Sequence, residues 1–499
     1  MQKNASLATD IFFPSPYRKW FLYGLLVFVI TAWFSVGYHH PDEHFQVLEF
    51  ANYKLGFSPA SNLPWEFFAQ CRSALQPFIV YCLVNLLEMI GFNNPFIVAF
   101  ILRLSMGVLT WWLNCRLVIL FLPTLRTEKS KSIFIGCSFF LWFVPYISVR
   151  FSAENLAGLL FFLAVSMIIK IDEYAFQNKT IRLILVGLLL GFSIYLRLQM
   201  AFALIGLGIW ILFLQKSNWK NLISIFIGGS LAILLSIYVD YWFYGNWVFT
   251  PFNYFKVNII DHKAKEFGVS AWWYYFPMFL ETAVLPIAIG LLLSFLLGIW
   301  KKPTHIYSLI CATFLIGHFF IGHKEIRFLF PIIYGFIFLV CVGIDKLLQE
   351  GTHKKIVSWA FSVLAGINLV LLVFRIFAPA QEAMKYYDFF YNYSQNQETT
   401  LITFERSPYY LVGLEANFYK NKKMDIQIIQ NTDQLSSILK NGYGKSHLFY
   451  TPGLTADIKF ASFKMRTIYC ILPGWILHFD VNHWQERANI GVVYQIDSP

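Results

Sequence analysis

Charged residues are scarce in this chain. Its 499 residues are 57% hydrophobic and 13% charged, whereas soluble domains carry about 25% charged residues. Apolar runs of about 18 to 25 residues recur along the chain, and each is long enough to cross a hydrocarbon core about 30 Å thick. The composition therefore excludes an ordinary soluble protein and indicates one that crosses a membrane several times.

Paired cysteines are also missing. The seven cysteines are scattered, mostly within apolar runs, and none forms a Cys-X-X-Cys pair. Cysteines of this kind are typical of small buried apolar residues, so neither a disulfide framework nor a zinc site is indicated. A cleavable signal peptide is not indicated either, because the first apolar run, 21–37, lacks a small-residue cleavage site. We also find no internal repeat and no low-complexity tract.

The net charge of +11 does not indicate a nucleic-acid surface. Much of the Lys and Arg lies in short loops between apolar runs, for example at 126–131 and 301–303, as expected of signals that orient a membrane protein. Assigning these basic loops to the cytoplasm fixes the predicted orientation. The N-terminus then lies inside.

Eleven membrane spans are predicted from the apolar runs: 19–38, 95–121, 132–150, 153–171, 181–197, 198–215, 221–243, 273–299, 304–322, 327–346 and 356–378. Segment 75–91 is also apolar enough to cross. A further crossing would place every later basic loop outside, so we interpret this segment as a membrane-embedded or re-entrant helix with both ends outside.

The composition changes after about residue 380. Short strand-like runs such as "TTLITFE" and "NIGVVYQID" are separated by Asn, Gly, Pro and Lys, and "TDQLSSILKNG" has the start and stop signals of a helix. We therefore predict an all-α polytopic membrane domain at 1–379, with a first outer loop at 39–94. A small soluble α/β domain at 380–499 follows it on the non-cytoplasmic side.

The segment "HHPDEH" places two carboxylates after a proline. Pro41 is suited to the first turn of a helix, and acidic residues there favour the helix dipole, so Asp42 and Glu43 could simply stabilise an interfacial helix. Alternatively, partial desolvation at the bilayer boundary would raise the pKa of a carboxyl and let it accept a proton. Three histidines flank the pair without a further ligand pattern and predict no metal site: His39, His40 and His44.

Two further clusters combine cations with carboxylates. In "PWEFFAQCRS", Arg72 follows Trp65 and Glu66, and it could snorkel or bind a carboxylate or phosphate with both arms of its guanidinium. The segment "GHKEIRF" lies on the predicted outer face, where Lys and Arg run against the positive-inside tendency. It could bind an anion or form a salt-bridge network around its glutamate; its charged residues are His323, Lys324, Glu325 and Arg327.

Polar residues also interrupt apolar runs. Glu154, Arg197 and Gln199 do so, and ionisable residues in such places are functional or are paired with one another. The loop 240–258, which includes Asn253, is rich in aromatic residues, Asn and Gly. That composition is typical of carbohydrate-binding surfaces and equally of an ordinary interfacial loop. The predicted orientation places all of these segments on the non-cytoplasmic face.

Four segments in this order carry a resemblance: "HPDEHFQVLEF", "PWEF…RS…P", "DYWFYGNWVFTPFNYFKVN" and "HKEIRFLFPI". Together they resemble the glycosyltransferase family 22 mannosyltransferases, which extend GPI anchors and the lipid-linked precursor of N-glycans. The resemblance covers about residues 20 to 340. It implies a GT-C fold, a polyprenyl-phosphate (dolichyl-phosphate-type) mannose donor, and transfer with inversion to a hydroxyl of a glycan or glycolipid acceptor.

The resemblance also implies roles for the candidate residues. Asp42 would be the general base, with Glu43, His40 and His44 supporting it. The donor phosphate would be bound by Arg72, His323, Lys324 and Arg327. The remaining residues would line or support the substrate site: Trp65, Glu66, Glu154, Arg197, Gln199, Asn253 and Glu325. No cofactor or metal is expected, because a lipid-phosphate leaving group needs no nucleotide-chelating metal. The expected partners are the lipid-linked sugar, the acceptor and membrane lipids, without nucleic acid.

Two alternatives stay open at this point. A transporter or flippase for lipid-linked saccharides would also contain intramembrane charges, although these would be spread across the midplane and both faces, whereas here they gather on one side. Another GT-C enzyme could transfer a different sugar. The content of Ile, Lys, Asn and Phe favours a bacterial inner membrane with a periplasmic site. The endoplasmic reticulum with a lumenal site is the alternative.

Overall fold

The structure is a computed structural model, and it describes residues 17–169, 179–350, 354–404, 406–441, 445–454, 465–488 and 490–496. The end of the predicted span 153–171 lies outside these residues. The chain divides into two compact units. The helical unit consists of Met1–Val36, Trp65–Leu86 and Val98–Pro379, and the sheet unit consists of Gly37–Pro64, Leu87–Ile97 and Ala380–Pro499. Residues 39–64, predicted as part of the first outer loop, thus belong to the same unit as residues 380–499.

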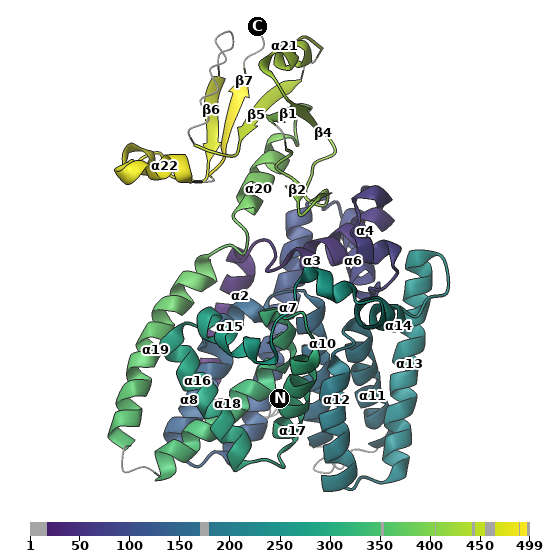
Figure 1. Ribbon diagram of the computed structural model, residues 1–499, viewed down its shortest axis with the longest axis vertical. Helices are drawn as coiled ribbons and strands as arrows, with labels where there is room; N and C mark the ends of the chain where they lie inside the picture. Colours follow the sequence, from purple (N-terminus) through teal and green to yellow (C-terminus); the bar gives the residue numbers. More distant parts are fainter. Residues whose placement is uncertain are drawn as a thin grey trace, which may run out of the picture. The chain divides into compact units, whose positions relative to one another are not determined.

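The helical unit contains the long apolar helices (Figure 1). Its α-helices are α2 (Arg18–Phe34), α5 (Trp65–Phe68), α6 (Leu75–Met89, shared with the sheet unit), α7 (Pro95–Phe121, likewise shared), α8 (Glu128–Phe140), α9 (Phe143–Ser148), α10 (Ala153–Ile169), α11 (Lys179–Leu196), α12 (Met200–Ile209), α13 (Trp219–Tyr244), α14 (Thr250–Phe255), α15 (Tyr275–Thr282), α16 (Leu285–Lys301), α17 (Ile306–Phe320), α18 (Ile333–Glu350) and α19 (Lys354–Phe377). Among its shorter helical turns, η6 (Lys263–Phe267) and η8 (Ile326–Ile332) matter for the site.

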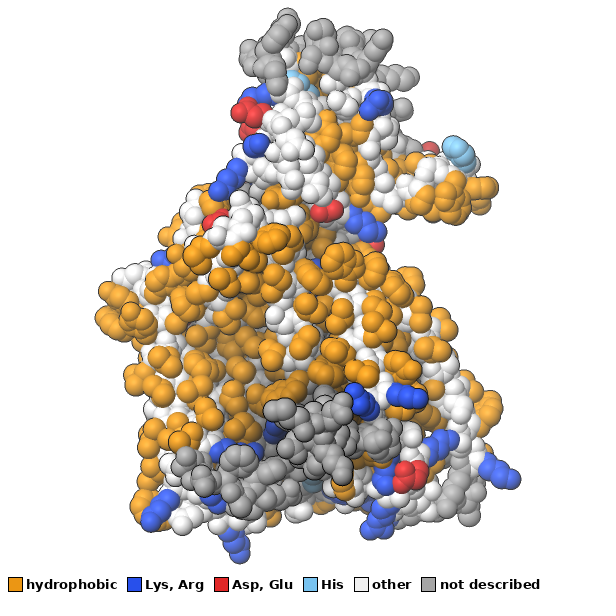
Figure 2. Space-filling model, turned by 180° about the vertical axis from the view of Figure 1, so that it is seen from behind, with side chains coloured by type: hydrophobic (Ala, Val, Ile, Leu, Met, Phe, Trp, Pro, Cys, Tyr) orange, Lys and Arg blue, Asp and Glu red, His pale blue; other side chains and the backbone are white. Residues whose placement is uncertain are grey.

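Within the described residues, five helices are long and apolar enough to cross a membrane, or six if the bent pair α16 and α17 counts as one span. Three shorter apolar helices accompany them: Leu75–Met89, Ala153–Ile169 and Met200–Leu214. On the face that Figure 2 shows, apolar side chains cover most of the helical unit, and Lys and Arg gather at one end of it. The chain is therefore a multi-pass membrane protein, while the number of eleven spans stays a prediction.

Two predicted spans are interrupted in the structure. Span 132–150 divides into α8 and α9, and Asn368 of α19 binds both backbone groups at the break. Its side chain accepts from the Trp142 N–H at 2.9 Å and donates to the Phe140 carbonyl at 2.7 Å. Span 273–299 divides into α15 and α16 at Val284, which has a left-handed φ of 66° and precedes Pro286 at the start of α16. A helix can break in an apolar setting only where its freed backbone groups find such partners.

Glycines let two helix pairs approach closely. A Cβ atom on Gly187 of α11 would lie 1.9 Å from the Ile225 carbonyl oxygen, and one on Gly228 of α13 would lie 1.9 Å from that of Ile184. The same reciprocal arrangement joins α16 and α18 through Gly298 and Gly343, where the distances are 2.0 Å. Small residues at such crossings allow helix backbones to pack directly, as in other membrane helices.

The sheet unit contains a five-stranded mixed sheet with the order β4-β1-β5-β7-β6. β1 is parallel to β4 and β5, whereas β7 is antiparallel to β5 and β6. α21 packs on one face through Leu435 and Leu439, and Tyr386 and Phe390 of α20 contact Tyr450 on the other. The bounds are α20 (Ala383–Tyr393), β1 (Thr399–Phe404), β2 (Tyr410–Leu411), β3 (Leu414–Glu415), β4 (Met424–Ile429), α21 (Thr432–Asn441), β5 (Ser446–Thr451), β6 (Met465–Cys470), α22 (Trp484–Arg487) and β7 (Val492–Ile496).

The same unit contains the segment with the carboxylate motif. Its helices are α3 (Pro41–Glu43), the π-helical turn His44–Glu49 and α4 (Phe50–Lys54), which follow one another without a gap. Pro41 is the first residue of α3, as the sequence predicts for a helix start.

Candidate functional site

A buried ion cluster lies where three segments of the helical unit meet. Glu154 stands in the first turn of α10, Arg197 directly follows α11, and Arg327 belongs to η8. One oxygen of Glu154, Oε1, lies 3.0 Å from Arg197 Nη2 and 3.6 Å from Arg327 Nη1. The three side chains are 3%, 4% and 9% exposed, respectively. Two guanidinium groups therefore share one carboxylate at the ends of apolar helices.

A second carboxylate, Glu325, extends this cluster. It receives the Nε of Arg327 on one oxygen and the Nη2 of Arg327 on the other, the latter at 3.1 Å. The Nε2 of His323 lies 2.8 Å from the same Glu325 Oε1. The salt-bridge network around Glu325 that the sequence left open is thus present. It also holds the Arg327 guanidinium in a fixed orientation, because two parallel bonds define its plane.

Lys324 is held differently from its neighbours. Its ammonium group donates to the carbonyls of His318 at 3.2 Å, Phe319 at 3.3 Å and Ile321, which lie at the C-terminal end of α17. An ammonium has three N–H donors, and here each has a carbonyl acceptor. Burial lowers the pKa of Lys324. The side chain therefore caps α17, a position where a cation also complements the helix dipole.

Arg72 lies in the loop between α5 and α6, next to Glu66. Its Nη2 is 3.5 Å from Glu66 Oε1, and its guanidinium lies over the ring of Tyr254, 5.1 Å from the centroid. Gln199 donates to the hydroxyl of the same tyrosine at 2.8 Å. Tyr254 was missed by the sequence analysis, which noted only that its loop was rich in aromatic residues.

The loop of Arg72 is also bound to the last residue of α13 and to α14. Asn253 donates to the Gln70 carbonyl at 3.0 Å, and the Tyr244 hydroxyl donates to the Arg72 carbonyl at 2.7 Å. Trp65, the first residue of α5, stacks on Phe267 of η6 with a centroid distance of 6.3 Å. Predicted residues that are far apart in sequence thus form one network in this unit.

Asp42 and its neighbours lie in the sheet unit. The Nδ1 of His40 accepts the Asp42 N–H at 3.2 Å and lies 3.3 Å from Asp42 Oδ1. Glu43 accepts the His39 N–H on Oε2 at 3.2 Å. The Asp42 side chain is 24% exposed. The imidazole of His40 therefore caps the helix start through Nδ1, directly beside the carboxylate of Asp42.

His44 faces the interior of the sheet unit. Its Nε2 lies 3.0 Å from Glu49 Oε1, and both side chains are fully buried. Its ring stacks on that of Tyr419, with the centroids 5.7 Å apart. Glu49 also accepts the Phe418 N–H at 2.6 Å and the Ser58 hydroxyl at 2.8 Å. Glu49 was not among the predicted residues. It joins the motif segment to the C-terminal part of the chain.

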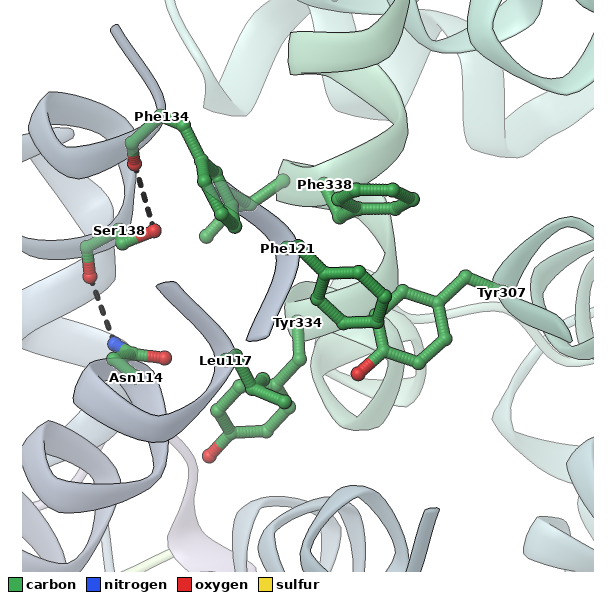
Figure 3. A pocket seen from close by; sticks show the side chains of 9 residues that line it. Asn114, Leu117, Phe121, Phe134, Ser138, Tyr307, Tyr334 and Phe338 are labelled. Carbon is green, nitrogen blue, oxygen red and sulfur yellow. Dashed lines mark hydrogen bonds between the residues drawn. The ribbon is translucent and has the colours of Figure 1, made fainter. Parts of the chain in front are cut away.

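A small pocket lies elsewhere in the helical unit, between α7, α8, α17 and α18 (Figure 3). Asn114 donates to the Ser138 carbonyl at 2.8 Å beside it, and Phe121, Tyr307 and Phe338 form an aromatic wall. None of the predicted site residues lines this pocket. The candidate site therefore rests on the ion and hydrogen-bond networks.

The fold defines the class of protein. The chain is similar to the crystal structure of ArnT from Cupriavidus metallidurans bound to undecaprenyl phosphate, with a TM-score of 0.52 and 10% sequence identity over 97% of this chain and 98% of that one. This likeness confirms the predicted GT-C-type membrane fold. The small C-terminal sheet domain is present as predicted.

The family follows from the sequence. The model of the Alg9-like mannosyltransferase family matches residues 20–411, and the chain belongs to this family, which confirms the predicted resemblance. GPI mannosyltransferase 3 of Yarrowia lipolytica is 26% identical over 366 residues, 69% of this chain and 66% of that protein. GPI alpha-1,2-mannosyltransferase 3 of Homo sapiens is 24% identical over 303 residues, 59% of this chain and 51% of that protein. The chain thus aligns with between half and two thirds of these relatives' lengths.

Proposed function

We propose that the protein is a membrane mannosyltransferase that transfers mannose from a polyprenyl-phosphate donor to a hydroxyl of a glycan or glycolipid acceptor, with inversion at the anomeric carbon. Family membership supports the sugar and the reaction type, and the named activities of the relatives support a GPI-type acceptor. The likeness to ArnT bound to undecaprenyl phosphate supports a lipid-phosphate donor.

The observation that carries the proposal is the buried cluster of Glu154, Arg197 and Arg327. Desolvating ions is unfavourable, and apolar residues of similar volume are often as stable or more stable than a buried ion pair. Stability alone therefore gives no reason for two buried arginines. In our proposal Arg197, Arg327 and His323 bind the donor phosphate together with Arg72. Preorganised guanidinium groups stabilise the negative charge that the phosphate gains as it leaves.

Three glutamates then take supporting roles. Glu66, Glu154 and Glu325 each contact an arginine of this set, and they orient the guanidinium groups while balancing part of their charge. We assign Lys324 to holding segment 322–325 against α17 rather than to direct phosphate contact, because its three donors bind carbonyls. The sugar is proposed to contact the polar and aromatic side chains nearby: Trp65, Gln199, Asn253 and Tyr254.

Asp42 is the proposed general base. As the acceptor oxygen attacks the anomeric carbon, an Asp42 carboxylate oxygen takes the hydroxyl proton. The bond between the anomeric carbon and the phosphate oxygen breaks on the opposite face, and its electron pair leaves with the phosphate. His40 fixes the backbone of Asp42 by accepting its N–H at 3.2 Å, and Glu43 fixes the loop through the His39 N–H. This route needs no metal or other cofactor.

A transfer assay with different classes of sugar donor tests the proposal. Purified full-length protein in lipid-containing detergent receives polyprenyl-phosphate mannose, polyprenyl-phosphate glucose or GDP-mannose, together with GPI precursors or lipid-linked oligosaccharides as acceptors. We expect labelled mannose to reach an acceptor only from the lipid-phosphate donor, with inverted configuration. Transfer of mannose from GDP-mannose would contradict the donor assignment, and so would transfer of glucose without any transfer of mannose. Movement of a lipid-linked saccharide across the membrane of vesicles that contain the protein, without any sugar transfer to an acceptor, would support a transporter instead.

We further propose that the protein resides in a bacterial inner membrane with a periplasmic active site. The basic loops support a non-cytoplasmic site, and ArnT comes from Cupriavidus metallidurans. The curated relatives named above come from Yarrowia lipolytica and Homo sapiens, so a lumenal site in the endoplasmic reticulum is the alternative. Localisation of the tagged protein in its native cells decides between the two membranes.

A further inference from the structure

Asp240 is a fully buried carboxylate that the sequence analysis did not select. It lies near the end of α13 and is 0% exposed. Its Oδ1 accepts the Ala74 N–H at 2.7 Å, and its Oδ2 accepts the hydroxyls of Tyr195 at 2.6 Å and Thr250 at 2.8 Å. An ionised carboxylate can only accept hydrogen bonds, and it accepts several at once. It is therefore suited to hold three separate donors together.

Each of the three donors lies close in sequence to a proposed substrate-binding residue. Ala74 lies two residues after Arg72, Tyr195 lies two residues before Arg197, and Thr250 lies three residues before Asn253. The contacts also sit at element ends, where small shifts change side-chain directions: Ala74 precedes α6, Tyr195 is near the end of α11, and Thr250 begins α14.

The loop of Arg72 receives further support from the same side. Besides the bond from its Ala74 N–H to Asp240, its carbonyls at Gln70 and Arg72 accept from Asn253 and Tyr244. Both ends of the short Gln70–Ala74 loop are thus tied to α13 and α14. The Asp240 bond holds the loop where it enters α6.

We infer that Asp240 is a positioning residue that fixes the backbone bearing Arg72, and through Tyr195 the backbone bearing Arg197, in the geometry that binds the donor phosphate. The inference rests on the proposed function, because it assumes that these arginines bind the phosphate. A misplacement of about 1 Å in a binding group can lower a rate about 100-fold. The Asp240 carboxylate itself does not touch the substrate.

The chain offers a matched control for a purely structural role. Asp345 in α18 is 6% exposed and also holds a helix start, because it accepts the Arg126 N–H at 3.1 Å and the Thr127 N–H at 3.0 Å before α8. The Thr127 hydroxyl donates to it as well, at 3.1 Å. Both aspartates belong to the helical unit. Asp345 contacts none of the proposed phosphate-binding residues.

The experiment compares Asp240→Ala, Asp240→Asn and Asp345→Ala in the full-length protein. It measures binding of polyprenyl phosphate, kcat and KM with polyprenyl-phosphate mannose, and thermal unfolding in detergent. For Asp240→Ala we expect weaker polyprenyl-phosphate binding and a kcat/KM lower by about 100-fold. Asp240→Asn retains one carbonyl oxygen for Ala74, and both hydroxyls can rotate to accept from its amide, so it should restore most of the binding. Asp345→Ala should lower the unfolding temperature without changing phosphate binding.

Each remaining outcome separates the two proposals. The positioning role alone would be overturned if folded Asp240→Ala kept the wild-type polyprenyl-phosphate binding and kcat/KM. It would also be overturned if Asp345→Ala lost as much of both as Asp240→Ala. A wild-type protein that neither binds polyprenyl phosphate nor transfers mannose would overturn the proposed function. If Asp240→Ala does not fold, Tyr195→Phe and Thr250→Val remove one donor each. Unchanged phosphate binding in both would then overturn the role of Asp240.

Discussion

Replacing Gly228 of α13 by alanine should separate α13 from α11. The added Cβ would lie 1.9 Å from the Ile184 carbonyl oxygen and 2.8 Å from the Leu188 nitrogen, and both are backbone atoms that cannot rotate away. Real Cβ contacts are essentially never shorter than 3.0 Å, so the helices must move apart by at least 1.1 Å, the difference between 3.0 Å and 1.9 Å. A gap of about 1 Å already forfeits up to about half of the dispersion energy of each atom pair along the crossing.

The expected loss of stability is about 3 kcal/mol, the upper end of the usual overpacking range of about 1–3 kcal/mol. It lies at the upper end because the helix backbones themselves must shift. Heating in detergent followed by size-exclusion chromatography measures the fraction that stays monodisperse. Gly366 in α19 is the control, since a Cβ there meets nothing within 4 Å, and Gly366→Ala should be neutral or stabilise by up to about 1 kcal/mol through helix propensity. Equal heat resistance of Gly228→Ala and wild type would refute the packing argument.

Two further substitutions test the buried polar groups outside the phosphate-binding set. Glu49→Ala leaves the buried Phe418 N–H without its acceptor, at a cost of about 1–3 kcal/mol. Limited proteolysis should therefore cut the sheet unit of Glu49→Ala faster than that of Glu49→Gln, which keeps one acceptor oxygen. Equal cleavage of the two variants would contradict this. Lys324→Met removes the cap of α17, so the unfolding temperature should fall while the KM for the lipid donor changes less than about 10-fold. A larger change in KM at an unchanged unfolding temperature would instead place the Lys324 ammonium on the phosphate.

Elements with a strong local signal could be predicted from the sequence. The predicted span 95–121 coincides with α7, and the strand-like runs "TTLITFE" and "NIGVVYQID" contain β1 and β7. Hydrophobic periodicity and turn residues determine such elements without reference to the rest of the chain. The interruptions at 141–142 and 283–284 could not be predicted this way, because the side chain that satisfies the first, Asn368, lies more than 200 residues away.

The charged residues of the candidate site could be predicted, but not their partners. Glu154 and Arg197 were selected because ions in apolar runs are functional or paired, and in the structure they are paired with each other. Asp240 and Glu49 were missed because their partners come from distant segments, such as Ala74 and Phe418. A buried carboxylate that binds distant backbone N–H groups is not marked by any characteristic residue spacing in the sequence. Their importance is visible only once the chain is folded.

The most direct test of the central claim is the turnover of Asp42→Asn with polyprenyl-phosphate mannose, measured beside donor binding. Asp425→Asn, at an exposed carboxylate of β4 in the same unit, serves as the control. We predict that Asp42→Asn binds the donor normally and loses about 100- to 10,000-fold in transfer rate, the usual contribution of a general base, whereas Asp425→Asn transfers at the wild-type rate. Wild-type turnover in Asp42→Asn would contradict the assignment of Asp42 as the base.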